Sequence, residues 1–172
     1  RILWSMCPPH SVLLAFTHDQ THRAPGRTPV LIWNTHTGHD VQPVGIDLPA
    51  SAFCMTVSPN GRFLAAAAYD GQHTTEIWDL TAKCRVAEIP TTRGPLQLRF
   101  SNDDRRLLVR CLQQFEVINI EDGAVARSLE LPGERALAIH PSRNWYLTQH
   151  TFGIAIIGCD EKQPIRTLGI GQ

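Results

Sequence analysis

Short apolar runs alternate with short polar segments along the whole chain, and the pattern returns about every forty residues. One landmark is an apolar run that enters a tight polar turn and continues into a second apolar run, at residues 4–14, 55–65, 98–108 and 137–147. A second landmark is an apolar run that ends in Trp or Ile before a polar turn, at residues 31–38, 76–83, 116–123 and 155–162. Two landmarks that keep their order four times indicate an internal repeat.

Each repeat divides into four short strands. In the second repeat we expect these strands at about residues 52–58, 63–69, 74–79 and 84–89. The dipeptides Asn60-Gly61, Asp70-Gly71 and Asp122-Gly123 stand between expected strands, where they supply the positive φ angles that two-residue hairpins need. No long stretch has the 3.6-residue period of a helix, so we expect very little helix.

The strand expected at residues 63–69 shows how the repeats assemble. Its sequence, FLAAAAY, is apolar on both faces, whereas a strand with one solvated face alternates apolar with polar residues. Each small sheet therefore needs cover on both sides, which the sheets before and after it supply. Stacked four-stranded antiparallel sheets around an axis form a β-propeller. We predict an all-β fold of four four-stranded blades, a β-propeller or an arc of one, with blades at about residues 1–48, 49–91, 92–133 and 134–172.

Several segments resemble the repeats of WD-repeat propellers. Residues 32–34 (Ile-Trp-Asn) and 76–79 (Glu-Ile-Trp-Asp) are similar to the end of the third strand in that family, and residues 57–62 resemble its first turn. The resemblance covers nearly the whole chain as four repeats, close in the second and loose in the fourth, where Ile157-Gly158 replaces Trp-Asp. The family's Gly-His dipeptide is absent, so its buried His–Asp hydrogen-bond network is not expected. The resemblance implies a propeller of about seven blades.

Four repeats do not complete a ring of that size. An open arc exposes one apolar face of its first and last sheets, and large exposed apolar patches mark interaction sites. These faces would be covered by remaining blades of the same longer chain, by self-association of two copies, or by closure of four blades alone. We expect the first arrangement, because the chain starts at Arg1 rather than at a methionine.

Charge and composition argue against several classes of partner. The 16 basic and 16 acidic side chains balance, so no net charge draws the chain to nucleic acid or to an anionic membrane. The longest apolar stretch, residues 63–69, is far shorter than the roughly 20 residues that span a bilayer. The basic run from Arg93 to Arg110 lacks interleaved aromatic residues on which bases could stack. We therefore expect neither nucleic acid nor a membrane as partner.

Five cysteines occur at wide intervals of 27 to 48 residues, namely Cys7, Cys54, Cys84, Cys111 and Cys159. None of these intervals has the two-to-four-residue spacing of a zinc knuckle. An odd number of cysteines favours reduced, mostly buried thiols over a disulfide framework, which indicates an intracellular and specifically cytoplasmic setting.

Catalytic motifs are missing from the sequence. It contains no Gly-x-Ser-x-Gly elbow, no phosphate-binding Gly-Lys-Ser/Thr loop and no His-Glu-x-x-His pair. The adjacent carboxylates Asp103-Asp104 and Glu121-Asp122 fall on expected hairpin turns, where solvated side chains are usual. We interpret Trp33 and Trp78 as core residues and Asp79 as an acceptor for turn amides. We predict that the chain is not an enzyme and binds no cofactor.

The long connection at residues 17–29 is the main candidate for a binding site. A hairpin needs two to five residues here, and long loops on a rigid scaffold often carry binding, although a tolerated surface insertion explains the length equally well. Together with the equivalent connection of the second repeat, it supplies the predicted partner-binding residues His18, Asp19, His22, Arg23, Arg27, Asp70 and His73. Loop histidines without close spacing are usually solvated, so we predict no bound metal.

These observations favour a non-catalytic protein–protein interaction scaffold that holds a protein or peptide partner on a pre-formed surface. The alternative is an accessory propeller of a larger enzyme, such as a hydrolase or a protein kinase, whose catalytic domain is not in this chain. A third hypothesis is a small-ligand or metal site at the mouth of the central channel.

Overall fold

The computed structural model describes most of the chain as β-strands and the tight turns between them. The described residues are 2–6, 12–17, 27–34, 42–49, 52–68, 74–90, 95–111, 114–122, 125–130, 135–140, 145–150, 153–158 and 164–169. These ranges contain sixteen strands and no helix. A helix able to cross a membrane is accordingly not found among them.

Consecutive strands pair antiparallel in groups of four, and the order within every sheet is the order along the chain. The first sheet contains β1 (Ile2–Met6), β2 (Val12–Thr17), β3 (Arg27–Asn34) and β4 (Gln42–Pro49). The second contains β5 (Ala52–Val57), β6 (Phe63–Ala68), β7 (Thr74–Asp79) and β8 (Cys84–Pro90). The third contains β9 (Gln97–Phe100), β10 (Arg106–Arg110), β11 (Gln114–Asn119) and β12 (Val125–Glu130). The fourth contains β13 (Arg135–Ile139), β14 (Trp145–His150), β15 (Gly153–Gly158) and β16 (Pro164–Gly169).

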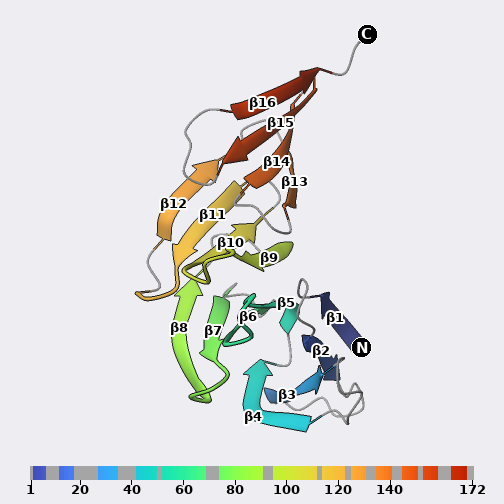
Figure 1. Cartoon of the computed structure of the whole chain (residues 1–172), viewed down its shortest axis with the longest axis vertical. Helices are drawn as coiled ribbons and strands as arrows, with labels where there is room; N and C mark the ends of the chain where they lie inside the picture. Colours follow the sequence, from blue (N-terminus) through green and yellow to red (C-terminus); the bar gives the residue numbers. More distant parts are fainter. Residues whose placement is uncertain are drawn as a thin grey trace.

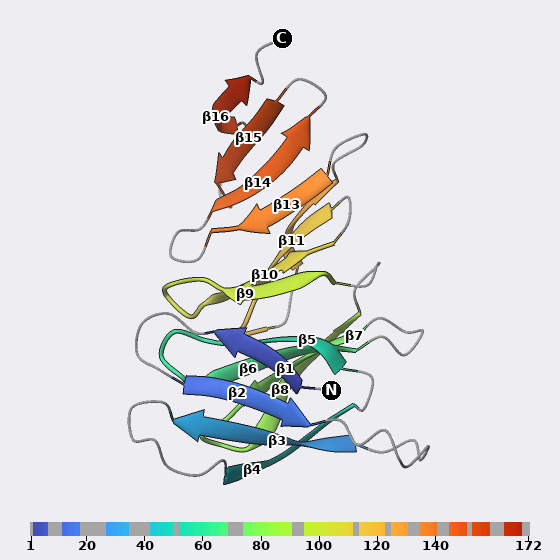
Figure 2. The same ribbon diagram turned by 90° about the vertical axis from the view of Figure 1, so that its right-hand side faces the viewer.

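The four sheets follow one another along an open arc (Figures 1 and 2). The first strands of successive sheets are neighbours, with β1 against β5 and β5 against β9. The first sheet (blue) and the fourth sheet (red) lie at opposite ends of the arc. The prediction of an all-β fold, built from four four-stranded antiparallel blades as a propeller or an arc of one, is confirmed.

Buried apolar side chains form three clusters, each between two neighbouring sheets. The cluster between the first and second sheets includes Val30, Ile46, Leu48, Met55, Leu64 and Ala66. The cluster between the second and third sheets includes Ala65, Ala67, Ile77, Ile89, Leu98, Phe100, Leu107 and Ile118. The cluster between the third and fourth sheets consists of Leu108, Phe115, Val117, Ile139, Tyr146, Ala155 and Ile157. The hydrophobic effect therefore holds each sheet to its neighbours and not only to itself.

Strand β6 shows why its sequence is apolar on both faces. Leu64 and Ala66 face the cluster shared with the first sheet, whereas Ala65 and Ala67 face the cluster shared with the third. All four residues are at most 2% exposed. The alanines leave room for the larger side chains of the neighbouring sheets, so the expectation that each sheet is covered on both sides is correct for β6.

Trp78 is less deeply buried than a core interpretation requires. Its side chain is half-buried against the cluster between the first and second sheets, and its indole Nε1 donates a hydrogen bond to Glu76 Oε2 at 2.9 Å. Glu76 is itself buried and also accepts a hydrogen bond from Arg85. Trp78 is thus a structural residue at the edge of the core, and the side chain of Trp33 lies outside the described residues.

The turn between β5 and β6 is built around Ser58. The Ser58 N–H donates to the Phe63 carbonyl, the Gly61 N–H donates to the Ser58 carbonyl, and the Phe63 N–H donates to Ser58 Oγ, each at 2.8 Å. Gly61 has φ of 76°, but Asn60 does not have a positive φ. The prediction of a two-residue hairpin at Asn60-Gly61 is therefore wrong. Five residues, 58–62, connect the strands, and the Asn60 side chain accepts a hydrogen bond from the Arg62 N–H instead.

The third sheet repeats this turn, with Ser101 in the place of Ser58. The Ser101 N–H donates to the Arg106 carbonyl at 2.9 Å, and the Arg106 N–H donates to Ser101 Oγ at 3.0 Å. Asp104 takes the place of Gly61 and has φ of 56°, in the left-handed region that favours glycine. Lys83, in the turn between β7 and β8, is the other non-glycine residue of the described chain with a positive φ.

The three described cysteines are free thiols in different surroundings. Cys111 is buried, Cys54 is half-buried and Cys84 is exposed. Burial raises the pKa of the Cys54 thiol, so its reactive thiolate is disfavoured. The expectation of mostly buried thiols is correct for Cys111 and wrong for Cys84, which opens β8 on the outer edge of its sheet.

Candidate functional site

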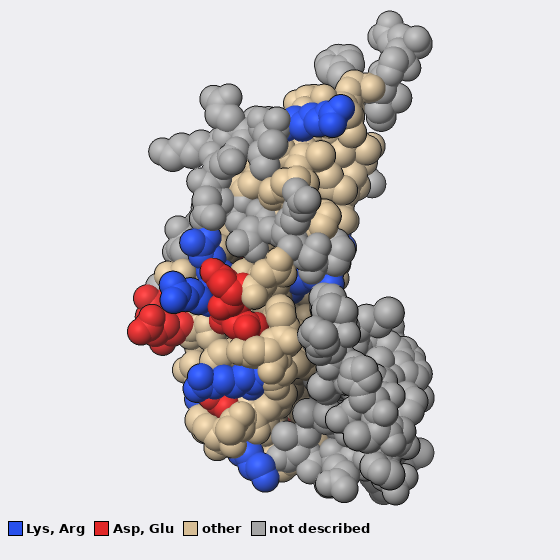
Figure 3. Space-filling view, viewed as in Figure 1, with Lys and Arg blue, Asp and Glu red and all other residues tan. Residues whose placement is uncertain are grey.

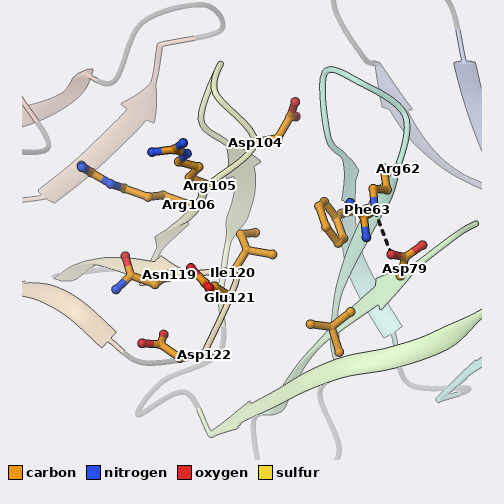
Figure 4. Close-up of a pocket in the computed structure, with 11 residues that line it drawn as sticks. Arg62, Phe63, Asp79, Asp104, Arg105, Arg106, Asn119, Ile120, Glu121 and Asp122 are labelled. Atoms are coloured by element: carbon orange, nitrogen blue, oxygen red, sulfur yellow. Dashed lines mark hydrogen bonds and ion pairs between the residues drawn. The ribbon is translucent and has the colours of Figure 1, made fainter. Parts of the chain in front are cut away.

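A cleft of about 710 Å³ lies between the second and third sheets (Figure 4). The second sheet contributes Arg62, Phe63, Asp79 and Val86. The third sheet contributes residues 104–106, from the turn before β10, and residues 119–122, from the end of β11 and the turn after it. The cleft is thus built from the same two turns of adjacent blades, which the repeat brings to one end of the sheets.

The floor of the cleft is apolar. Phe63 and Ile120 extend into the gap from opposite sheets in Figure 4. The Phe63 ring also stacks on Phe100 of the third sheet, with 6.5 Å between ring centroids, so the two sheets fix its position. Val86 of β8 adds an apolar side chain that is 40% exposed. An apolar floor that is fixed before binding lowers the ordering cost of association.

Asp79 forms one wall of the cleft and holds the turn between β7 and β8. Its Oδ1 accepts hydrogen bonds from the N–H groups of Thr81 and Ala82, both at 2.9 Å, which confirms its interpretation as an acceptor for turn amides. Its Oδ2 pairs with Arg62 Nε at 2.8 Å. The Ala82 N–H and the Arg62 guanidinium hold the pKa of Asp79 below its usual value, which favours the carboxylate form that pairs with Arg62.

The turn of the third sheet forms the opposite rim. The Ser101 hydroxyl and the Arg105 N–H lower the pKa of Asp103, whereas partial burial and the neighbouring Asp103 carboxylate raise the pKa of Asp104. Asp104 Oδ1 accepts a long contact of 3.4 Å from the Asn60 N–H of the second sheet. The turns of two adjacent blades therefore touch at the rim of the cleft.

Charges of both signs surround the apolar floor. Arginines contribute the positive charge, and Asp104, Glu121 and Asp122 contribute negative charge on the third-sheet side. Figure 3 shows blue and red side chains next to one another on the visible face, and the described residues there form no broad area of one sign. A surface of this kind suits a partner with charges of both signs more than a polyanion such as nucleic acid.

The partner-binding residues predicted from the sequence lie outside the described residues. They are His18, Asp19, His22, Arg23, Asp70 and His73, and Arg27 is described only as the first residue of β3, without its side chain. In the sequence they fall between β2 and β3 and between β6 and β7, and the strand ends that flank them, Thr17 with Arg27 and Ala68 with Thr74, lie at the end of the sheets opposite to the cleft. The prediction for these residues therefore stays a prediction.

The cleft joins residues of two repeats and was not predicted from the sequence, although several of its residues lie on expected hairpin turns. The sequence predicts that Asp104, Glu121 and Asp122 are solvated turn residues, which is correct for exposed Glu121 and Asp122 and wrong for half-buried Asp104. The constant order of the two repeated landmarks could have indicated the cleft, because equivalent turns of neighbouring repeats meet at one end of the sheets. Among the described side chains, no three His, Cys, Asp or Glu residues are grouped as they would be around a metal ion.

Comparison with known proteins supports the fold and leaves the function open. No family model matches the sequence, and no curated protein sequence matches it. The fold matches 890 chains of known structure, and a shared fold by itself does not indicate one activity. One is Kuenenia stuttgartiensis hydrazine synthase, with a TM-score of 0.65 and 16% identity over 97% of this chain and 48% of that one. Another, titled "Complex of KlAtg21 with coiled-coil of AgAtg16", has a TM-score of 0.71 and 11% identity over 98% of this chain and 57% of that one.

Both structures are of the β-propeller type, and at these identities the likeness concerns the fold alone. The chain spans about half the length of the solved structures it matches. The four sheets are therefore blades of a β-propeller or of a sector of one.

Proposed function

We propose that this chain is a non-catalytic interaction scaffold, part of a WD-repeat-like propeller, which holds a protein or peptide partner in the cleft between its second and third blades. The observation that carries the proposal is the cleft itself, with an apolar floor between two charged rims. Its volume of about 710 Å³ falls within the roughly 300–1,000 Å³ of ligand sites in proteins. The proposal includes a cytoplasmic setting, which rests on the odd number of cysteines.

The WD-repeat part of the proposal rests on the geometry of the turns. The same serine-centred turn joins the first two strands of the second and third blades. At the end of the third strand of the second blade, Asp79 follows Trp78 and accepts hydrogen bonds from the next turn. These features occupy the segments in which the sequence resembles the family.

The chemistry of the cleft specifies the kind of partner. The apolar floor at Phe63, Val86 and Ile120 fits an apolar side chain, whose burial would supply most of the free energy of binding. The charged rims fit flanking residues of both signs, which would fix the register of the partner. The propeller described in complex with a coiled coil shows that a protein of this fold holds a helical partner, and here it serves only as a fold-level analogy.

Two matched substitutions test the cleft. A displayed library of random peptides is selected on the chain, and the affinity of the best peptide is measured by fluorescence anisotropy. Val86→Glu should weaken binding at least about tenfold, because it places a carboxylate in the apolar floor. Leu96→Glu is the control, because Leu96 is 47% exposed, against 40% for Val86, and does not line the cleft. Equal binding by the two variants would contradict the proposed site.

Hydrogen exchange on the same complex separates the two candidate surfaces. Binding in the cleft protects backbone amides of residues 79–86 and 119–122. Binding at the residues predicted from the sequence protects residues 17–29 and 70–75. Protection confined to 17–29 and 70–75 would retain the scaffold function but overturn the cleft as its site.

A further inference from the structure

The two sides of the cleft differ in how far the protein balances its own charge. On the second-blade side, the carboxylate of Asp79 pairs with Arg62 Nε at 2.8 Å. The guanidinium carbon of Arg62 also lies 4.9 Å from the centroid of the Phe63 ring, so one arginine contacts both the acidic wall and the apolar floor. The charges that line the second-blade side therefore balance each other within the protein.

The third-blade side carries carboxylates without such a cation. Asp104, in the turn between β9 and β10, and Glu121, in the turn after β11, both line the cleft. Among the described residues, no arginine or lysine forms an ion pair with either carboxylate. Partial burial raises the pKa of Asp104 and no cation lowers it, whereas Arg62 helps to lower the pKa of Asp79. We call Asp104 and Glu121 the acidic rim.

Two arginines beside the acidic rim extend away from the floor of the cleft. Figure 4 shows the side chains of Arg105 and Arg106 pointing away from Phe63. Alternation along β10 agrees for Arg106, because this residue lies on the same face of the strand as Leu108, which packs toward the fourth sheet. These arginines therefore do not neutralise the acidic rim on the side that faces the floor.

We propose that the cleft holds a peptide segment of another protein in which an apolar side chain stands next to a lysine or arginine that pairs with the acidic rim. This inference rests on the proposed function, because it takes the cleft as the binding site and specifies the chemistry of the segment held there. The apolar side chain packs against Phe63 and Val86 and supplies affinity, whereas the cation supplies specificity. A segment with an acidic residue at this place meets like charge at the rim and is rejected.

Two displayed peptide libraries test this charge preference on the 172-residue chain. Both libraries vary one central apolar position. The flanking positions are lysine or arginine in the basic library and aspartate or glutamate in the acidic library. The best peptide of the basic library should bind at least about tenfold more tightly than the same peptide with acidic flanks, measured by fluorescence anisotropy, because an attraction is replaced by a repulsion.

Matched charge reversals then locate the preference. Glu121→Lys should weaken binding of the best basic peptide about three- to tenfold, which is the range for reversing one charge at an exposed rim, and should strengthen binding of its acidic counterpart. Glu88→Lys is the control, because Glu88 is also exposed but does not line the cleft. Both variants change the net charge by the same amount, so a difference between them reports position and not overall charge.

Each outcome decides the matter. A basic preference that Glu121→Lys removes and Glu88→Lys preserves supports the proposal. A preference that both variants reduce equally comes from net charge and overturns the acidic rim. If Val86→Glu weakens binding but acidic and basic peptides bind equally well, the cleft remains the site and only this proposal is overturned. If Val86→Glu leaves binding unchanged, the cleft itself fails as the site, and both proposals fail with it.

Discussion

Replacing Asp104 by glycine should stabilise the protein, because the third blade has an aspartate where the second has a glycine. Asp104 has φ of 56° and Gly61 has φ of 76° in equivalent turns. A left-handed backbone costs an ordinary residue about 1–2 kcal/mol, and Asp somewhat less because its short side chain bonds locally. Glycine loses more conformational freedom on folding than other residues do. This entropy cost offsets about 0.5–1 kcal/mol of the stability that is gained by relieving the backbone. The expected net stabilisation of Asp104→Gly is about 0.5–1 kcal/mol.

The pH dependence of this effect has a definite sign. Partial burial and Asp103 raise the pKa of Asp104 in the folded state, so folding favours its protonated form. The negative charge of Asp104 therefore destabilises the fold at a pH above its folded-state pKa. This destabilisation disappears once the pH is below the unfolded-state pKa of about 3.9, where the side chain is protonated in both states. The advantage of Asp104→Gly over the natural chain should be larger at pH 7 than at pH 3.

Urea denaturation followed by fluorescence measures the free energy of unfolding, and the melting temperature should rise by about 1–4 °C. Two control variants separate the causes. Asp104→Asn removes the charge but keeps a side chain that tolerates the left-handed region, and Asp104→Ala removes the charge without relieving the backbone. Gly and Ala variants of equal stability would refute the reasoning, because they would show that the positive φ does not limit stability at this turn.

Three further predictions concern the core, the acid response and the thiols. Leu64→Ala should lower the free energy of unfolding, measured by urea titration, by about 2–5 kcal/mol, because Leu64 is fully buried between two sheets. The control Leu96→Ala, at a position that is 47% exposed, should change it by less than about 0.5 kcal/mol. The pKa of Asp79 is lower in the folded than in the unfolded chain, so its carboxylate stabilises the fold above the unfolded-state pKa of about 3.9. This stability is lost as the pH falls through the folded-state pKa. The urea midpoint of Asp79→Asn should therefore fall less between pH 7 and pH 3 than that of the natural chain. Alkylation followed by peptide mass spectrometry should label exposed Cys84 in the folded chain and buried Cys111 only after unfolding, and equal labelling would contradict the placement of Cys111 in the core.

Local chemistry made several parts of the structure predictable. The continuous apolar run of β6 and the glycine that precedes it are local features of the sequence, so the strand bounds near residues 63–68 and the positive φ at Gly61 follow from the residues themselves. The role of Asp79 is of the same kind, because its partners Thr81 and Ala82 are two and three residues away.

The sequence alone did not indicate the features that depend on how two blades are rotated against each other. The cleft joins Phe63 to Ile120, and the contact of Asn60 with Asp104 crosses 44 residues, so neither has a local signal. The half-exposure of Trp78 and the left-handed backbone of Lys83 were not foreseen either. Periodicity fixes which face of a strand is apolar, but the angle between neighbouring sheets decides which side chains meet across that face and which turns enclose a space.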